Sequence, residues 1–309
     1  MQEWLNLFPQ TLVNGLTLGS VYALIALGYS MVYGILKLLN FAHGDIYMIG
    51  AYLGYGVYLL VNADKAGLIP AALVIVLMLV VAMVGAGLVS VGVERFAYRP
   101  LRYAPRLAPL ISALGVSFIL QNIVQITAGP RPLSLGSGTL IPTGASLLIG
   151  GVNLHVARLL VIGVTLILML GLTYFVRSTR LGRAMRAGSI DLDAAQMMGV
   201  NVNQVIVATF FIGAMLAGAA GVLVGIVFFS IRHTMGFLAG LKGFTAAVLG
   251  GIGSIPGAVL GGLLLGMAES FTAVYLSVTF NDAIAFLLLV VVLLVRPNGL
   301  LGKALVQKV

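Results

Sequence analysis

Long apolar segments separated by short polar ones run along almost the whole chain. A helix needs about 20 apolar residues to cross the hydrocarbon core of a membrane. The pattern therefore predicts an all-α, polytopic bundle of transmembrane helices, with nine spans as the best count and eight to ten as the range that interrupted helices allow. The nine segments are residues 12–36, 46–61, 70–92, 107–127, 157–176, 205–229, 236–249, 258–275 and 283–295.

The composition agrees with this pattern. Hydrophobic residues make up 61% of the 309 residues and charged residues only 8%, whereas soluble globular proteins carry about 25% charged residues. We therefore expect a single transmembrane domain over residues 1–309, which includes a polar loop at 177–204. The absence of cysteine excludes disulfides, thiolate metal sites and thiol catalysis.

Positive charge is concentrated in two short loops, within a net charge of +9. The arginines of these loops are Arg95, Arg99, Arg102 and Arg106, then Arg177, Arg180, Arg183 and Arg186. Such clusters are typical of cytoplasmic loops. With Arg296, Lys303 and Lys308 they predict a cytoplasmic C-terminus, and they place the N-terminus and the loop 128–156 outside. Because membrane topology accounts for the charge, nucleic-acid binding is not indicated.

The loop 177–204 is predicted to contain two helices. Its four arginines are spaced three apart, so one helix would carry them as a basic stripe. A second, short helix follows, for which Ser189 can act as N-cap and Gly199 stands where a left-handed C-cap is expected. Asp191 and Asp193 lie in its first turn, where the helix dipole favours acidic side chains.

This short helix has one apolar face. Ile190 and Ala194 follow the spacing of such a face, and Met197 and Met198 continue it one turn later. The helix is too short to span a membrane. Its apolar face must be buried either against the chain's own membrane domain or in a groove on a partner protein.

Two interruptions divide the apolar pattern. One is the polar stretch Asn40–Asp45, and the other is the Gly-rich stretch Gly250–Gly257, which contains Pro256. In transporters, paired interrupted segments often border the translocation pathway, because irregular backbone is tolerated only where it is buried or lines water. The hypothesis is that both interruptions border the path of a solute. The alternative is that they are ordinary turns.

The sequence contains no recognisable nucleotide-binding or catalytic motif. A phosphate-binding GxxxxGK[ST] loop is missing, so the chain is not expected to hydrolyse ATP. His43, His155 and His233 lack the spacing of a metal site. Glu269 alone among the acidic residues falls inside a predicted span, which offers little for proton or sodium coupling. A membrane pathway beside a docking helix indicates that another subunit supplies the energy.

Seven ordered blocks of sequence are distributed over nearly the whole chain. They are residues 14–28 (NGLTLGSVYALIALG), 31–35 (MVYGI), 40–44 (NFAHG), 48–52 (MIGAY), 94–101 (ERFAYRPL), 244–258 (FTAAVLGGIGSIPGA) and 296–300 (RPNGL). In this order they resemble the branched-chain amino acid ABC importer permeases of the LivH type. The loop 128–156 has no such match.

The resemblance implies a permease that moves Leu, Ile or Val through a bacterial cytoplasmic (inner) membrane. Its partners would be a second, homologous permease subunit, two cytoplasmic ABC ATPase subunits and an extracytoplasmic solute-binding protein. ATP and Mg²⁺ would be used by the ATPase subunits, and this chain would bind neither a cofactor nor a metal.

The resemblance also assigns ATPase coupling to the short helix. The predicted coupling residues are Ser189, Asp191, Ala194, Ala195, Met197, Met198 and Gly199. Ile190 stands where relatives commonly have the first acid of an acidic pair, so a contact that needs this acid is not expected. Met197 and Met198 stand where Leu-Leu is usual, a change that conserves volume and adds adaptability.

Polar and Gly-rich residues near the interruptions are the candidates for the solute path. They are Tyr22, Asn40, His43, Gly44, Gly250, Gly251, Gly253 and Pro256. For Tyr22, Asn40 and His43, the alternative is helix packing with a satisfied hydrogen bond. Two alternative functions also stay open: the same type of permease for urea, a short amide or another amino acid, and an ion-coupled carrier that works alone.

Overall fold

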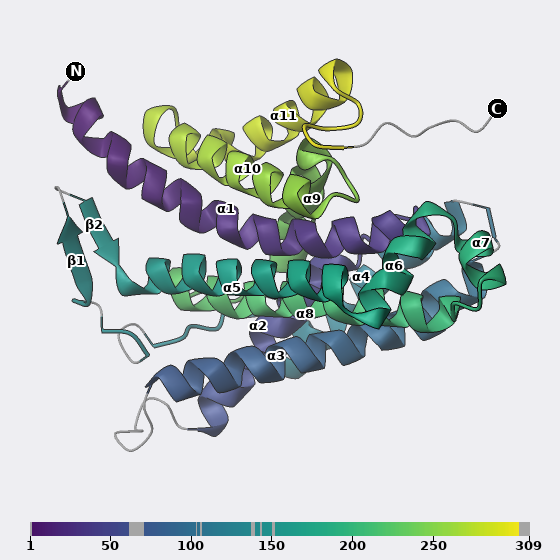
Figure 1. Ribbon diagram of the computed structural model, residues 1–309. Helices are drawn as coiled ribbons and strands as arrows, with labels where there is room; N and C mark the ends of the chain where they lie inside the picture. Colours follow the sequence, from purple (N-terminus) through teal and green to yellow (C-terminus); the bar gives the residue numbers. More distant parts are fainter. Residues whose placement is uncertain are drawn as a thin grey trace.

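The computed structural model describes residues 2–61, 71–102, 104–105, 107–136, 140–142, 144–149 and 152–302. Arg106, Lys303 and Lys308, which the sequence placed in the cytoplasm, lie outside these ranges. The described part is almost entirely helical (Figure 1). Its elements are α1 (Gln2–Leu36), α2 (His43–Leu60), α3 (Ala71–Val93), the π-helix η1 (Glu94–Tyr98), the 3-10 helix η2 (Arg99–Leu101), α4 (Leu107–Ala128), β1 (Ser146–Ile149), β2 (Val152–His155), α5 (Val156–Ser178), α6 (Arg180–Ile190), α7 (Leu192–Met197), α8 (Val202–Phe228), α9 (Met235–Gly250), α10 (Ile255–Tyr275), the 3-10 helix η3 (Val278–Phe280) and α11 (Asn281–Val295).

Each predicted apolar segment contains a helix, which confirms a polytopic helical membrane protein. Seven helical stretches among the described residues are long and apolar enough to cross a membrane, and they lie in α1, α3, α4, α5, α8, α10 and α11. The two remaining predicted segments are the shorter or more polar helices α2 and α9. Helix α9 has 16 residues, and α2 carries His43 and Asp45 in its first turn.

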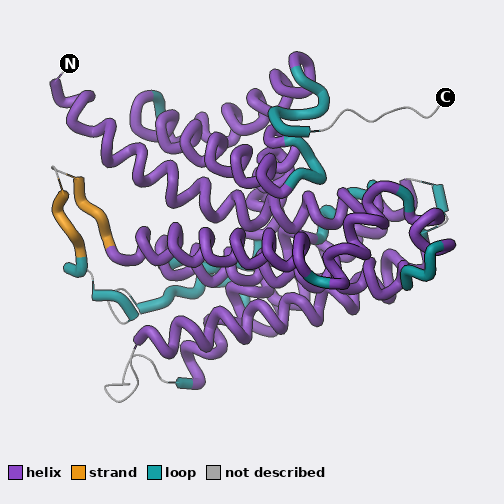
Figure 2. The backbone as a smooth tube through the Cα atoms, in the orientation of Figure 1, coloured by secondary structure: helices purple, strands orange, loops and turns teal. Residues whose placement is uncertain are grey.

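The long helices run side by side, and the two ends of the molecule differ (Figure 1). The strands and the N-terminus lie at one end, which we call the hairpin end, and α6 and α7 lie at the other, the α7 end (Figure 2). The strands pair antiparallel, with Ser146 opposite His155 and Ile149 opposite Val152. The sequence predicted only a loop here, since four-residue strands are too short for a hydropathy pattern to reveal.

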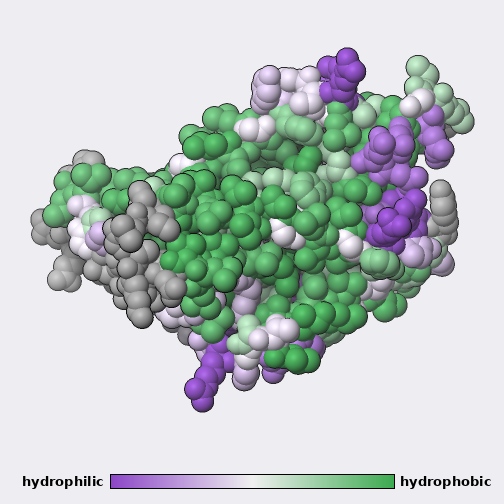
Figure 3. Space-filling model, turned by 90° about the horizontal axis from the view of Figure 1, so that it is seen from below, coloured by the Kyte–Doolittle hydropathy of each residue, from purple (hydrophilic) through white to green (hydrophobic). Residues whose placement is uncertain are grey.

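Helices α1 and α8 form the centre of the bundle. In their apolar windows 83% and 72% of the residues are buried, compared with 17% for α5 and 6% for α11. The surface in Figure 3 is largely apolar, and hydrophilic atoms gather toward the α7 end. An apolar surface of this kind is suited to lipid or to another membrane subunit.

Glycine allows the central helices to approach closely. A Cβ at Gly15 would lie 2.9 Å from Met267 Cα, and one at Gly19 would lie 2.8 Å from Leu263 Cα. Small residues at these positions bring the backbones of α1 and α10 together, as is common in membrane helix pairs.

Helices α2 and α9 both begin inside the bundle, and their first turns meet. Gly44 and Asp45 are buried, whereas Leu60 at the end of α2 is 84% exposed. A Cβ at Gly44 would lie 2.6 Å from Gly240 Cα, and one at Gly236 would lie 2.6 Å from Asp45 Oδ1. The interruption that meets the start of α2 is therefore residues 229–234, before α9, and not the Gly-rich stretch that the sequence paired with it.

The predicted interruption at Gly250–Gly257 is confirmed, but it is short. Gly251 and Gly253 have φ of 108° and 90°, a region that favours glycine. Ser254 then caps α10, and Pro256 lies in its first turn, where a proline does not break a helix. The backbone N–H of Leu301 donates to the carbonyl of Gly250 (2.9 Å), so the chain after α11 closes over this break.

The contact between the first turns of α2 and α9 predicts a stability effect. Gly44→Ala should lower the stability of the detergent-solubilised protein by about 1–3 kcal/mol, because the added methyl group has no room beside Gly240. Thermal unfolding would measure the change. Gly163→Ala is the matched control, since a Cβ there meets no atom within 4 Å. Equal melting temperatures for the two variants would contradict this packing.

Candidate functional site

The loop 177–204 forms α6 and α7, but the N-cap of α7 is not the predicted one. Ser189 lies in the last turn of α6, where its hydroxyl donates to the carbonyl of Arg186 (2.7 Å). Asp191 is the N-cap, and its Oδ1 accepts from the backbone N–H groups of Asp193 and Ala194, both at 3.0 Å. A carboxylate at this position also interacts favourably with the helix dipole. The predicted Ser189 cap was therefore wrong, and α7 has only six residues.

The predicted basic stripe is divided between two helices. Arg177 belongs to the last turn of α5, and α6 begins after Thr179, whose extended backbone separates the two helices. Arg183 and Arg186 on α6 donate to two backbone carbonyls at the end of α5. Carbonyls at a helix C-terminus lack helical partners, so these arginines stabilise the junction between α5 and α6.

The apolar side chains predicted for one face of the short helix are exposed, but Ile190 is the last residue of α6 and does not belong to α7. Ile190 and Met197 are each 87% exposed, Met198 is 85% exposed, and Ala194 is also exposed. Ala195, on the inner side of α7, is buried. Of the two burial sites that the sequence allowed for this face, the chain's own membrane domain does not cover it. Gly199 follows with the predicted left-handed conformation, at φ 84°.

A chain of polar contacts joins the end of this loop to the first interruption. Asn203, in the first turn of α8, accepts a hydrogen bond from Arg102, which also forms an ion pair with the buried carboxylate of Glu94. Four residues after Glu94, the hydroxyl of Tyr98 donates to Asn40 Oδ1 (2.9 Å). The arginine-rich segment 94–102, which contains η1 and η2, thus contacts both the start of α8 and the backbone break before α2.

The predicted polar solute contacts are buried in this conformation. The hydroxyl of Tyr22 donates to Glu269 Oε2 at 2.9 Å. Asn40 is 2% exposed and His43 is 1% exposed, and the His43 ring packs edge-on against Tyr29, with ring centroids 4.7 Å apart. The contact of Tyr22 is the one that the helix-packing alternative describes, whereas Asn40 Nδ2 and His43 Nε2 are buried without a hydrogen-bond partner among the described residues.

The two interruptions that the sequence predicted, at 40–45 and 250–257, contact α1 at different heights along its axis. His43 packs against Gly28, whereas Gly253 packs against Gly34. Six helical residues separate these levels, which corresponds to about 9 Å along the helix axis. Gly44 therefore lies apart from Gly250, and α1 is the element that connects the two groups of predicted path residues.

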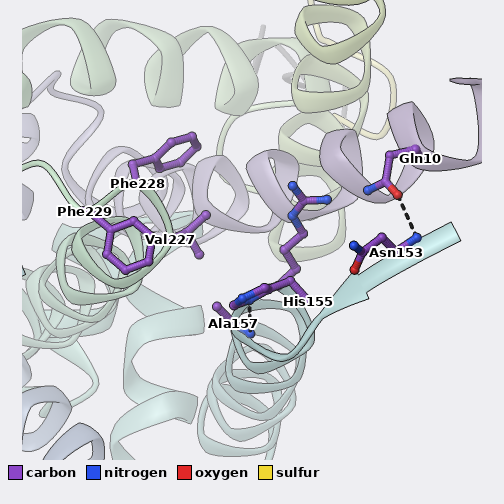
Figure 4. Close-up of a pocket in the computed structure, with 8 residues that line it drawn as sticks. Gln10, Asn153, His155, Ala157, Val227, Phe228 and Phe229 are labelled. Atoms are coloured by element: carbon purple, nitrogen blue, oxygen red, sulfur yellow. Dashed lines mark hydrogen bonds between the residues drawn. The ribbon is translucent and has the colours of Figure 1, made fainter. Parts of the chain in front are cut away.

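A cavity of about 610 Å³ opens at the hairpin end. Figure 4 shows Gln10, Asn153 and His155 on one side of it and Phe228 and Phe229 on the other. The residues that line it come from α1, β2, α5 and the end of α8. None of the predicted path residues is among them. Nor do the described His, Asp and Glu residues form a group of three that could hold a metal ion.

Comparison with known proteins identifies the family. Residues 11–293 match the family described as the branched-chain amino acid transport system permease component. The chain belongs to this family. It is 46% identical over its full length to the whole high-affinity branched-chain amino acid transport system permease protein LivH of Escherichia coli K12, and 45% identical, again over both full lengths, to LivH of Salmonella typhimurium. It is also 47% identical to BraD of Pseudomonas aeruginosa over 98% of each chain. No solved structure matches the chain.

The permease fold contains a buried carboxylate site that the sequence analysis did not predict. Ser117 and Gln121 of α4 both donate to the carboxylate of Asp45, the second at 3.0 Å. Gly236, at the N-terminus of α9, lies beside the same carboxylate, so the helix dipole also stabilises its charge. Ser117 and Gln121 stand four residues apart in a predicted span, a spacing that could have revealed one polar face.

A second charge site of the permease surrounds Lys242 of α9, in which Glu269 is buried and Asp282 is half-exposed. Its Nζ lies 3.0 Å from Glu269 Oε1 on α10 and 2.7 Å from Asp282 Oδ1 on α11. Together with the Tyr22 hydrogen bond, these contacts join α1, α9, α10 and α11. The sequence placed Lys242 and Glu269 in apolar segments but could not pair them, because they are distant along the chain.

The cap of α7 predicts a local effect on dynamics. Asp191→Ala should increase hydrogen exchange of the α7 amides about fivefold, because loss of an N-cap costs about 1 kcal/mol. Asp191→Asn should change the exchange much less, since an amide oxygen can accept the same hydrogen bonds. Mass spectrometry of the permease in lipid nanodiscs would measure both. Equal exchange in the two variants would show that the Asp191 side chain does not cap α7.

Proposed function

We propose that this chain is the membrane-spanning permease subunit of an ATP-driven importer for branched-chain amino acids. The observation that carries this proposal is the identity of 45–47% to LivH and BraD permeases, which extends over 98–100% of each chain. The relatives named for branched-chain amino acid transport support Leu, Ile and Val as the solutes of this permease.

The proposed assembly contains a second permease subunit, two cytoplasmic ATPase subunits and an extracytoplasmic solute-binding protein. ATP and Mg²⁺ would be bound by the ATPase subunits and not by this chain. The exposed side chains of Ala194, Met197 and Met198 at α7, with Ile190 at the end of α6, support a docking role, because an amphipathic helix can bury apolar side chains in a hydrophobic groove. Methionine side chains suit this role since they adapt to irregular surfaces.

Motion of α7 has a physical route to the membrane helices. We propose that closure of the ATPase subunits shifts α7 and Asn203, which is hydrogen-bonded to Arg102. The loop 94–102 would then act on Asn40 through Tyr98, beside the break where α1 ends and α2 begins. Rigid helices that pivot at such breaks can alternate between outward-open and inward-open states.

The proposed solute path follows α1 between the interruption before α2 and the interruption before α10. Gly44, Gly250, Gly251, Gly253 and Pro256 lie at or beside irregular backbone, and the path would open when α2 and α9 separate. Tyr22, Asn40 and His43 are buried before that separation. A lining with few fixed charges suits a zwitterionic solute with an apolar side chain, which has to be released as well as bound.

The function can be tested in proteoliposomes that contain the complete importer. We expect leucine uptake when the loaded binding protein is outside and ATP is inside, and none when the ATPase subunits are left out. Excess isoleucine or valine should reduce leucine uptake, whereas urea and acetamide should not. Uptake of urea or acetamide in place of leucine would favour the alternative solute.

The ion-coupled alternative has its own test. This chain would be reconstituted alone, with a proton or sodium gradient and no ATP. Leucine accumulation under these conditions would contradict the proposal that partner ATPases supply the energy.

The docking face can be tested by placing a charge on it. Ala194→Arg should weaken copurification of the ATPase subunits at least about tenfold, because an unpaired charge would have to be buried in the groove. Leucine uptake should fall in parallel, with unchanged amounts of permease in the membrane. Gln196→Arg is the control, since Gln196 is exposed on the other side of α7. Normal copurification with Ala194→Arg would exclude this face from the interface.

A further inference from the structure

The cavity at the hairpin end has one polar wall that carries a positive charge. Arg158 lines this wall in the first turn of α5 and is half-buried. No described carboxylate lies within ion-pair distance of Arg158, and no acidic residue is among the described residues that line the cavity. A half-buried arginine without an anionic partner is unusual, because burial of an unpaired charge is costly.

The position of Arg158 in its helix is also unfavourable. Helix N-termini carry a partial positive charge, so acidic residues are favoured there and basic ones are not. His155 caps this N-terminus through Nδ1, which accepts from the backbone N–H of Ala157 at 3.3 Å. The arginine and the end of α5 therefore combine into a positive site, which is suited to an anionic group of a ligand.

The opposite wall is apolar and is formed by the end of α8. Val227, Phe228 and Phe229 line it. Phe229 adopts a left-handed conformation, with φ 52°, which is rare for a bulky residue. This turn ends α8 at the cavity, where the last carbonyl groups and the negative end of the helix dipole favour a cation.

We infer that this cavity is a binding site for the free amino acid on the permease itself. Arg158 binds the carboxylate, the C-terminal carbonyls of α8 face the ammonium group, and Val227, Phe228 and Phe229 contact the alkyl side chain. The volume of about 610 Å³ is within the range of small-molecule sites. This inference rests on the proposed function and adds an outer site, away from Tyr22, Asn40 and His43.

An anionic lipid headgroup is the competing occupant, and the two walls favour the amino acid over it. A phosphate group would interact with Arg158 but would gain nothing from the carbonyl end of α8, which disfavours anions. A zwitterion with a short alkyl group matches the positive wall, the negative helix end and the apolar surface together.

The test uses the complete importer in proteoliposomes and a leucine analogue with a diazirine in its side chain. After illumination, mass spectrometry should find the label on the peptide that contains residues 227–229. Arg158→Gln should reduce this labelling about tenfold, because charge-assisted hydrogen bonds to the carboxylate are lost, and Arg158→Lys should restore part of it. Arg131→Gln, which changes an exposed arginine outside the cavity, should have no effect.

Competition identifies the occupant. Unlabelled leucine should suppress the labelling, whereas leucinamide, which lacks the carboxylate, should not. Equal labelling in wild type and Arg158→Gln, or equal competition by leucinamide, would overturn the inference. So would suppression of the labelling when phosphatidylglycerol is added to neutral phosphatidylcholine vesicles. If ATP-driven leucine uptake continued in these cases, only the outer site would be excluded, whereas loss of wild-type uptake would contradict the proposed function.

Discussion

Backbone groups inside a membrane need hydrogen-bond partners, and this constraint governs how α2 and α9 can begin in the middle of the bundle. A helix start exposes N–H groups without helical acceptors, which hydrocarbon cannot satisfy. Here the two starts contact each other, because Gly44, Gly236 and Gly240 allow the two first turns to touch. The carboxylate of Asp45 lies at the N-terminus of α9, so the positive ends of broken helices and a buried acid stabilise one another.

Two buried carboxylates, those of Asp45 and Glu269, each have polar partners within the bundle. Asp45 is compensated by Ser117, Gln121 and the end of a helix, and Glu269 is compensated by Lys242 and Tyr22. Each group joins helices that are distant in sequence. Since a partner left alone would be an unpaired charge in a low-dielectric interior, these contacts restrict which helices can separate. They make rotation of intact groups of helices the economical form of movement.

Local sequence was sufficient for the spans, the Gly251–Gly253 break and the left-handed Gly199, because each depends on residues near one another in the chain. Local sequence did not give the correct N-cap of α7, because two nearby residues can both cap a helix. Ser189 and Asp191 are both good N-caps, and the choice depends on whether α6 continues to Ile190. It also failed for the partner of the first break, since the contact of Gly44 with Gly240 is tertiary. Buried ion pairs such as Lys242–Glu269 were missed for the same reason.

The described chain leaves two uncovered features at opposite ends of a tightly packed centre. One is the apolar face of α7, and the other is the cavity beside Arg158. Helix α5 extends from the cavity to α6, and α6 leads to α7, so two consecutive helices connect the proposed amino acid site with the proposed ATPase contact. A helix transmits displacement over its length better than a loop does, and α5 has few buried residues to hold it in place. Movement of α5 against α1 and α8 would therefore change the shape of the cavity while the buried charge sites remain intact.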